Sequence, residues 1–216
     1  RLESNLVKLE GGLFGTARSV IGLNLLETKN SKGSHNAFVA SEYFRSDGYF
    51  ESPQDFSRIN GTAKYIFNWN NGKRLVASAS AFSSAWDASG QIPVRAVNSG
   101  VISRFGAIDD TEGGETSRYQ AYLDFVTPIS NNALLENKLY AVRYDFLLYS
   151  NFTFFLNNPT DGDQIRQQES RMIYGYKSHL TRNGTISGKD LITEFGGGRF
   201  AAYFAAEYLN IVVVSL

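Results

Sequence analysis

The sequence contains no cysteine, only two histidines and no excess of either charge. Without cysteine the chain has no disulfide, no cysteine-ligated zinc, no iron–sulfur cluster and no thiol nucleophile. Its 21 Lys+Arg balance its 21 Asp+Glu, so it lacks the basic footprint of a nucleic-acid-binding protein. It also lacks an uninterrupted run of about 18 apolar residues, so no transmembrane helix is expected. No signal peptide opens it, and because Arg1 is not Met we expect a processed chain or a piece of a longer one.

Aromatic residues are abundant instead. They make up 14% of the chain, with 12 Tyr and 16 Phe, although hydrophobic residues reach only 43%. A water-soluble protein would hide so many aromatic rings in a core. A membrane β-barrel displays them outward to lipid, in alternation with polar residues that face its lumen.

Period-two alternation identifies strands. The run TAKYIFNW, residues 62–69, puts Ala63, Tyr65, Phe67 and Trp69 on one face, with Lys64 on the other. Residues 70–72, Asn-Asn-Gly, supply the positive φ values of a tight hairpin turn. The run at 73–86 then returns as the hairpin partner.

Three later runs alternate in the same way and hold charges on their polar faces. In the first, Tyr119, Ala121, Leu123 and Phe125 oppose Gln120, Tyr122 and Asp124. In the second, Tyr140, Val142, Tyr144, Phe146 and Leu148 oppose Leu139, Ala141, Arg143 and Asp145. In the third, Met172, Tyr174, Tyr176 and Leu180 oppose Arg171, Ile173, Gly175, Lys177 and His179. We expect the tyrosine-rich sets to face lipid and the charged sets to face a lumen. A soluble sheet with one wet face also fits the alternation alone.

The connections favour the barrel. Candidate strands lie near 1–10, 16–28, 36–46, 58–70, 73–86, 118–127, 137–149, 169–182 and 190–205. Connections at 30–35 and 70–73 are short, and those at 47–57, 87–117 and 150–168 are longer. Alternating short turns and long loops are typical of outer-membrane barrels. We expect the connection at 128–136 to be longer than a tight turn, an exception to this rule. No repeat or linker divides residues 1–216, so we predict one all-β, antiparallel unit.

Charged residues in the lumen and in one loop are the candidates for contact with a ligand. The segment from Ala88 to Ser117 has no strand period, and a loop of about 30 residues suggests a function; its charges are otherwise merely solvated. Asp109, Asp110 and Glu112 lack the ordered ligand spacing of an EF-hand, so no metal site is predicted. The ligand-contact candidates are Lys64, Arg95, Arg104, Asp109, Asp110, Asp124, Arg143, Asp145, Arg171 and Lys177.

Enzyme chemistry has little support in the sequence. Ser178 and His179 are neighbours on a strand, so their side chains point to opposite faces and cannot form a nucleophile–base pair. No G-x-S-x-G elbow and no phosphate-binding glycine motif occurs. We therefore predict no catalytic residues, no cofactor and no enzymatic activity.

Three segments resemble the barrel region of TonB-dependent outer-membrane receptors, particularly the Bacteroidetes type. They are YFRSDGYFESPQDFSRINGTAKYIF (43–67), GQIPVRAVNSGVISRFGAIDDTEGGETSRYQAYLDF (90–125) and NPTDGDQIRQQESRMIYGYKSHLT (158–181). The resemblance extends from about the start of the chain to Gly198. It implies an outer-membrane importer for a small ligand such as a siderophore, a metal complex, cobalamin or a glycan fragment. Transport in that family draws energy from an inner-membrane complex through TonB.

The chain departs from the family pattern in three respects. The family barrel has 22 strands and about nine are recognisable here; no plug domain or TonB box is found; and residues 199–216 form an apolar tail that loses the strand–turn rhythm. We therefore expect a partial barrel that does not carry out coupled uptake alone and that meets TonB only through the missing plug region. A truncated or frameshifted gene would explain the tail.

Three other interpretations remain open. The first is a passive outer-membrane porin or another small barrel. The second is a soluble β-sandwich or lipocalin-like ligand-binding protein. The third is an outer-membrane hydrolase. Apart from a small-molecule ligand, the partner expected from the leading interpretation is the lipid of the bacterial outer membrane.

Overall fold

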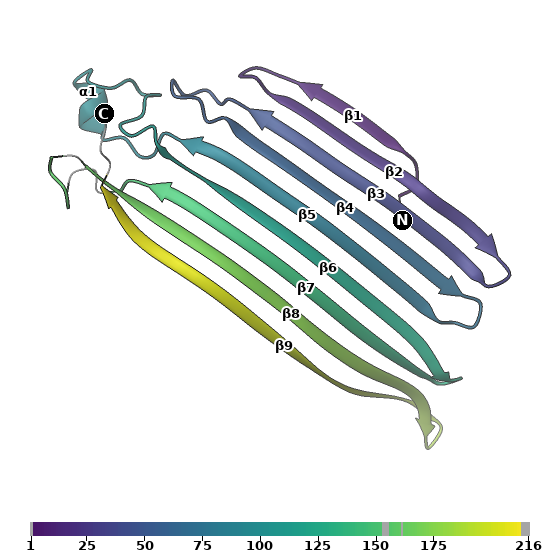
Figure 1. The fold of residues 1–216 in the computed structure, drawn as a ribbon. Coiled ribbons are helices and arrows are strands. Elements are labelled where there is room, and N and C mark those ends of the chain that lie inside the picture. The colour runs from purple at the N-terminus through teal and green to yellow at the C-terminus, as the bar shows by residue number, and fades with distance from the viewer. Residues whose placement is uncertain (1, 153–155, 161, 213–216) are drawn as a thin grey trace.

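The computed structural model describes residues 2–152, 156–160 and 162–212, which form one antiparallel sheet of nine strands and one short helix (Figure 1). The all-β prediction is confirmed, and each predicted strand has a counterpart. The helix α1 (Val94–Asn98) lies in a loop. No helix within the described residues is long and apolar enough to cross a membrane. The strands are β1 (Leu6–Gly11), β2 (Ala17–Asn30), β3 (Gly33–Ser46), β4 (Phe56–Trp69), β5 (Arg74–Ala88), β6 (Glu112–Ser130), β7 (Ala133–Ser150), β8 (Asp163–Ile186) and β9 (Lys189–Val212).

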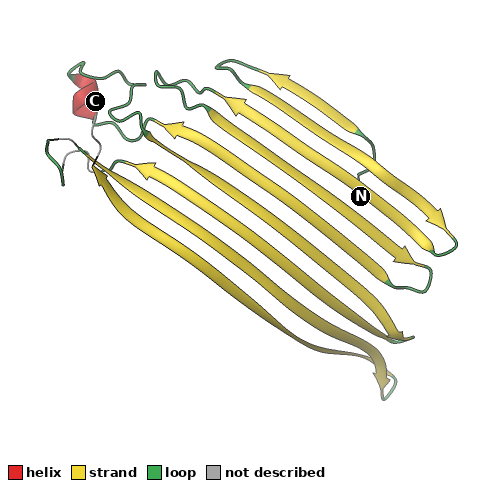
Figure 2. Ribbon diagram, viewed as in Figure 1, coloured by secondary structure: helices red, strands yellow, loops and turns green. Residues whose placement is uncertain are grey.

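The sheet is a meander in which every strand pairs with its neighbours in the chain. The strands β1 and β9 form its two edges and do not pair with each other, so the sheet is open rather than closed into a barrel (Figure 2). Each edge exposes a row of unpaired backbone N–H and C=O groups. The predicted barrel is therefore observed only as an antiparallel sheet.

Connections at one end of the sheet have two to four residues, and those at the other end have five or more. Residues 31–32, 70–73, 131–132 and 187–188 make the turns at one end, and residues 12–16, 47–55, 89–111 and 151–162 make the loops at the other. We call these the short-turn end and the long-loop end. The alternation is complete because the connection predicted at 128–136 is a two-residue turn: β6 and β7 both extend into that segment.

Two further expectations about the chain are corrected. The loop predicted from 88 to 117 spans only 89–111, since β6 begins at Glu112. The tail predicted to lose the strand rhythm after residue 198 continues as β9, which pairs with β8 as far as Val212. Residues 213–216 of the tail lie outside the described part of the chain.

The sheet is a single layer. Its accessible surface is 14402 Å², whereas a compact monomer of this mass would expose roughly 9900 Å². Among the described residues, Val76 is the only buried hydrophobic side chain. The tyrosines and phenylalanines are therefore not packed between two sheets, as a β-sandwich would require.

Register divides the strand residues into two faces. One face carries Ile59, Tyr119, Leu123, Leu139 and Met172, and we call it the apolar face. The opposite face, the polar face, carries four of the predicted lumen residues. They are Lys64, Asp124, Arg171 and Lys177.

The predicted orientation of β7 is wrong. Asp124 lies opposite Lys138, so the even-numbered residues of β7, including Tyr140 and Tyr144, lie on the polar face. Arg143 and Asp145 lie on the apolar face. The cause is a β-bulge between Pro128 and Ser130: one extra residue in a strand reverses the face of every residue beyond it.

Gly114 is a position where the sheet tolerates no side chain. A Cβ atom there would lie 2.5 Å from the backbone oxygen of Leu147 and 3.0 Å from the ring of Trp86. The backbone atom cannot swing aside, so the two strands would have to separate.

We expect Gly114→Ala to lower the free energy of unfolding by about 1–3 kcal/mol, the usual cost of overpacking, as measured by urea titration in detergent micelles. The control is Gly184→Ala, since a Cβ atom at Gly184 meets no atom within 4 Å. Equal midpoints for the two variants would contradict this close packing.

Candidate functional site

The apolar face contains a continuous belt of uncharged side chains, which we call the apolar band. From β2 to β8 the one charged residue level with it is Arg143, which lies opposite Tyr119 and Met172 at the edge of the band nearest the long loops. It runs from Ile59 to Trp69 on β4 and from Met172 to Leu180 on β8, which matches the roughly 9–11 residues that a tilted strand needs to cross a bilayer. Its members include Ile21, Leu23, Val39, Ile59, Ala63, Tyr65, Phe67, Trp69, Leu75, Ala77, Ala79, Ala81, Tyr119, Ala121, Leu123, Phe125, Leu135, Leu139, Ala141, Met172, Tyr174, Tyr176 and Leu180.

Large side chains of the band are exposed. Ile59 is 53% exposed and Leu123 44%. Soluble monomers rarely leave a contiguous apolar surface of this extent uncovered, and such patches mark contact with a membrane or a partner. On the edge strand β9 the pattern weakens, because Arg199 lies opposite Tyr176.

Charged residues occur at the same positions along the strands, but on the polar face. Lys64 lies between Ala63 and Tyr65 of the band, and Asp124 lies between Leu123 and Phe125. Farther along the sheet, Lys177 lies directly opposite Lys138, which pairs with Glu136 at 2.9 Å. Arg171 stacks over the ring of Tyr144, with its Cζ 5.0 Å from the ring centroid. Except for Arg143 at the long-loop edge, charge is therefore segregated by face along the band.

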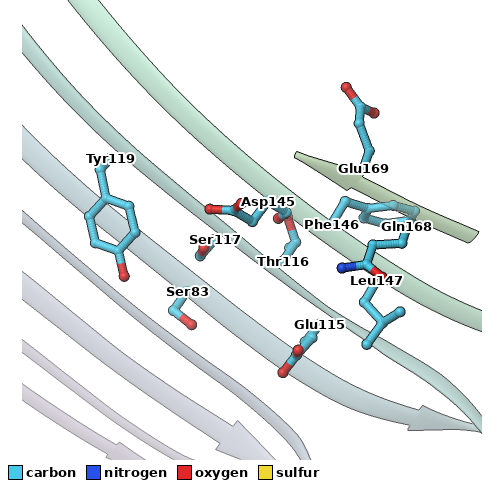
Figure 3. A pocket seen from close by; sticks show the side chains of 10 residues that line it. All are labelled: Ser83, Glu115, Thr116, Ser117, Tyr119, Asp145, Phe146, Leu147, Gln168 and Glu169. Atoms are coloured by element: carbon cyan, nitrogen blue, oxygen red, sulfur yellow. The ribbon is translucent and has the colours of Figure 1, made fainter. Parts of the chain in front are cut away.

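Arg143 and Asp145 lie on the apolar face toward the long-loop end. Arg143 is opposite Tyr119 and Met172, at the edge of the band, and Asp145 is two residues farther along β7. The Nε atom of Arg143 donates to Asp145 Oδ2 at 2.9 Å, and Ser170 donates to Asp145 Oδ1 at 2.7 Å. Asp145 lines a hollow of about 270 Å³, with Ser117 and Tyr119 near it (Figure 3). These two predicted ligand contacts thus pair with each other, away from Lys64 and Asp124.

A chain of alternating charges crosses the polar face from β1 to β4. Lys8 and Arg18 both bind Glu10, at 2.9 and 2.7 Å, and Arg18 and Arg58 both bind Glu42, at 2.9 and 2.7 Å. Three cations therefore share two carboxylates, which leaves a formal charge of +1. Arg58 is the last member and lies nearest the long-loop end.

Beside Arg58 the polar face forms the aromatic hollow, a depression of about 580 Å³ at the long-loop end. Arg58 lies over the Phe44 ring, with its Cζ 5.6 Å from the centroid, and Phe44 meets Phe56 edge to face at 5.7 Å. Phe82 and Trp86 continue the wall. The remaining lining residues are Ser46, Gly48, Gln54, Ser84 and Thr116.

Loops at this end hold one another through aromatic rings and backbone hydrogen bonds. Tyr49 stacks on Phe50 at 4.6 Å and meets Phe105 edge to face at 5.7 Å. The backbone N–H of Glu51 donates to the Phe105 carbonyl at 3.0 Å. Loop 47–55 is thereby tied to loop 89–111, and Gln54 is held beside the hollow.

The predicted loop residues divide by role. Arg95 lies in α1 and is exposed, as are Arg104 and Asp110. Asp109 is instead a structural anchor: its Oδ2 accepts from Asn151 Nδ2 at 3.0 Å, and its Oδ1 accepts from the Thr111 N–H at 3.0 Å. It joins loop 89–111 to loop 151–162.

Glu112 lies beside this anchor and is only 5% exposed. Burial raises the pKa of its carboxyl; the backbone N–H of Asn151 acts against that rise, and the charge of Asp109 adds to it. Its Oε1 atom has no hydrogen-bond partner among the described residues. Within that part of the chain, no group of three or more His, Cys, Asp or Glu residues is arranged to hold a metal ion.

Sequence reasoning missed the residues of the aromatic hollow and of the charge chain. The hollow draws on four strands and one loop, so its members lie far apart in the sequence. One local signal was available: Phe56, Arg58, Asn60, Thr62 and Lys64 alternate on β4. That pattern would place Arg58 on the same face as Lys64, a predicted contact.

Comparison with models of known protein families and with curated protein sequences finds no match to the chain.

The raised pKa of Glu112 makes the base of the long loops sensitive to pH. Because the folded state holds this proton more tightly than the unfolded state, ionisation of Glu112 lowers stability as the pH rises above the ordinary value of 4.5. We expect Glu112→Gln to slow proteolysis of loop 89–111 at pH 7, and to have little effect well below pH 4.5. Glu115→Gln, at an exposed glutamate of the same strand, is the control. A Glu112→Gln effect that persists unchanged at low pH would contradict the burial argument.

Proposed function

We propose that this chain is part of the β-barrel of a TonB-dependent outer-membrane receptor that takes up a small ligand. The apolar band contacts lipid, and the polar face lines the lumen. The observation that carries the proposal is the segregation of charge: Lys64 and Asp124 lie on one face, between band residues that lie on the other.

A bilayer supplies the physical reason for that segregation. A charged side chain that faces lipid near the middle of a membrane costs about 2–4 kcal/mol, whereas a charge in a wet lumen keeps its hydration. In water the same exposed band would favour aggregation. A soluble barrel or sandwich would instead bury one face in a core, and the described residues bury one hydrophobic side chain, Val76.

The open edges also bear on the proposal. In hydrocarbon each unpaired backbone group costs several kcal/mol, so only closed barrels cross membranes with strands. The free edges of β1 and β9 would therefore be paired in the membrane, as they are within a larger barrel. Coupled uptake in the receptor family needs a plug, so transport belongs to the complete receptor rather than to this sheet alone.

Features of the long-loop end support a receptor more than a passive channel. The long loops are fastened together through Phe105 and Asp109, and they stand over a hollow whose walls combine aromatic rings with a guanidinium. Such a combination of apolar walls and few polar groups is typical of a ligand-binding site.

Neighbouring residues of β6 provide a direct test of the lipid-facing band. We expect Ala121→Arg to remove the chain from the outer-membrane fraction of bacteria that express it, because the new charge would face lipid at a cost of about 2–4 kcal/mol. Gln120→Arg adds the same side chain one residue away, on the polar face, and should leave the fractionation unchanged. Equal behaviour of the two variants, or a wild-type chain that is a folded monomer in buffer without detergent, would contradict the proposal.

The passive-channel alternative has its own measurement. Liposomes that contain the chain should show no more solute leakage than liposomes that contain Ala121→Arg. Selective, saturable flux through the wild-type chain alone would favour a porin.

A further inference from the structure

The aromatic hollow has the chemistry of a binding site for one class of ligand. We propose that it binds an aromatic carboxylate, with the ring against Phe44, Phe82 and Trp86 and the carboxylate on Arg58. This inference rests on the proposed function, because it names the ligand class of the polar face. No residue of the hollow was among the candidates predicted from the sequence.

The size and the aromatic walls of the hollow suit a small ring. The hollow measures about 580 Å³, within the range of roughly 300–1000 Å³ that is typical of small-molecule sites. Its aromatic side chains come from β3, β4 and β5, so they are fixed by neighbouring strands rather than by a mobile loop. Aromatic rings favour offset or edge-to-face contact with another ring, the geometry that Phe44 and Phe56 already adopt at 5.7 Å.

Arg58 supplies the positive charge of the hollow. Among the described residues its guanidinium donates only to Glu42, through Nη2, and its side chain remains 36% exposed. A guanidinium has five N–H donors in a planar fork that matches a carboxylate. The chain of charges that ends at Arg58 has three cations and two carboxylates. The single negative charge of a bound carboxylate would neutralise its net charge of +1.

Position makes the hollow accessible. It lies beyond Ile59 and Ala81, where the apolar band ends on β4 and β5, and therefore outside the lipid-facing part of the sheet. Gln54 is held at its rim, because its backbone N–H donates to the Asp47 carbonyl at 2.7 Å and its carbonyl accepts from the Asp87 N–H at 2.7 Å. A ligand that arrives from the long-loop end meets this hollow before it reaches Lys64.

The two tryptophans of the chain allow a direct test. Trp86 lines the hollow, while Trp69 lies on the apolar face at the short-turn end. Two probes that quench tryptophan fluorescence would be titrated into the full chain in detergent micelles. One is 4-nitrobenzoate, and the other is its uncharged analogue 4-nitrobenzamide. A Trp69→Phe variant reports Trp86 alone, and a Trp86→Phe variant reports partition of the probe into the micelle.

We expect saturable quenching of Trp86 by 4-nitrobenzoate, with weaker binding of the amide and only non-saturating quenching of Trp69. In the Trp69→Phe background, Arg58→Gln should weaken binding of the carboxylate at least about tenfold and leave the amide unchanged. Arg45→Gln is the matched control: Arg45 belongs to the neighbouring strand β3 but lies on the opposite face, so both affinities should persist. Phe82→Ala should weaken both probes.

Several results would overturn the inference. One is equal affinity for the carboxylate and the amide; another is an Arg58→Gln variant that binds the carboxylate as tightly as its parent. If Arg58→Gln does not fold, Arg58→Lys, which keeps the charge, should bind the carboxylate more tightly than the amide, and failure to do so also overturns it. Absence of saturable quenching in a chain that fractionates with the outer membrane would remove the inference and leave the proposed function in place. Saturable binding of 4-nitrobenzoate by a chain that is a folded monomer in buffer without detergent would support the inference and contradict the proposed function.

Discussion

Every residue of a single-layer sheet points to one of two faces, and neither face of this sheet is covered. A folded chain of this size normally gains its stability from apolar surface removed from water, yet here Val76 is the only buried hydrophobic side chain among the described residues. Cross-strand hydrogen bonds hold the strands together, and each face contacts a solvent or a partner rather than a core. The apolar band and the charges behind it are consistent with two different solvents, lipid on one side and water on the other.

Local contacts on the polar face show how such a surface is organised without a core. The charge chain from Lys8 to Arg58 pairs each carboxylate with two cations, so neither acid remains uncompensated. Large rings cover gaps in the pleat: Tyr140 lies over Gly175, where an added Cβ atom would approach the ring within 2.6 Å. Aromatic residues thus serve both faces, as exposed members of the apolar band on one and as packing on the other.

Because aromatic residues occur on both faces, an aromatic residue in the sequence does not by itself predict which face of the sheet it lies on. The existence and order of the strands follow from period-two alternation, which needs only local information. The turn at Asn70–Gly72 also forms as predicted, although only Gly72 has the expected positive φ. The facing of β7 does not follow, because Tyr140 and Tyr144 look like lipid-facing residues and Arg143 looks like a lumen residue. Cross-strand register decides the matter, and the bulge near Pro128 sets that register. Its one local signal is the proline itself, since proline in a central strand occurs at bulges or strand ends.

In the candidate site, too, some features follow from local alternation and others depend on contacts between distant segments. Lys64, Asp124, Arg171 and Lys177 share a face because each follows the simple alternation of its own strand. Asp109 is anchored to Asn151 across two loops, and the aromatic hollow assembles residues from 44 to 116. Contacts of that kind depend on which loops lie next to each other, and the alternation of residues within a strand does not predict which loops do.

Accessibility along β6 tests most directly whether the two faces meet different solvents, and the absence of native cysteine makes single labels possible. Nitroxides would be attached to cysteines introduced singly at positions 119–125 of the chain in lipid vesicles. We expect labels at the odd-numbered positions to collide with dissolved oxygen and labels at the even-numbered positions to collide with a water-soluble nickel complex, in strict alternation. Equal exposure of both sets to the nickel complex would mean that the apolar band does not face lipid, and would contradict the account.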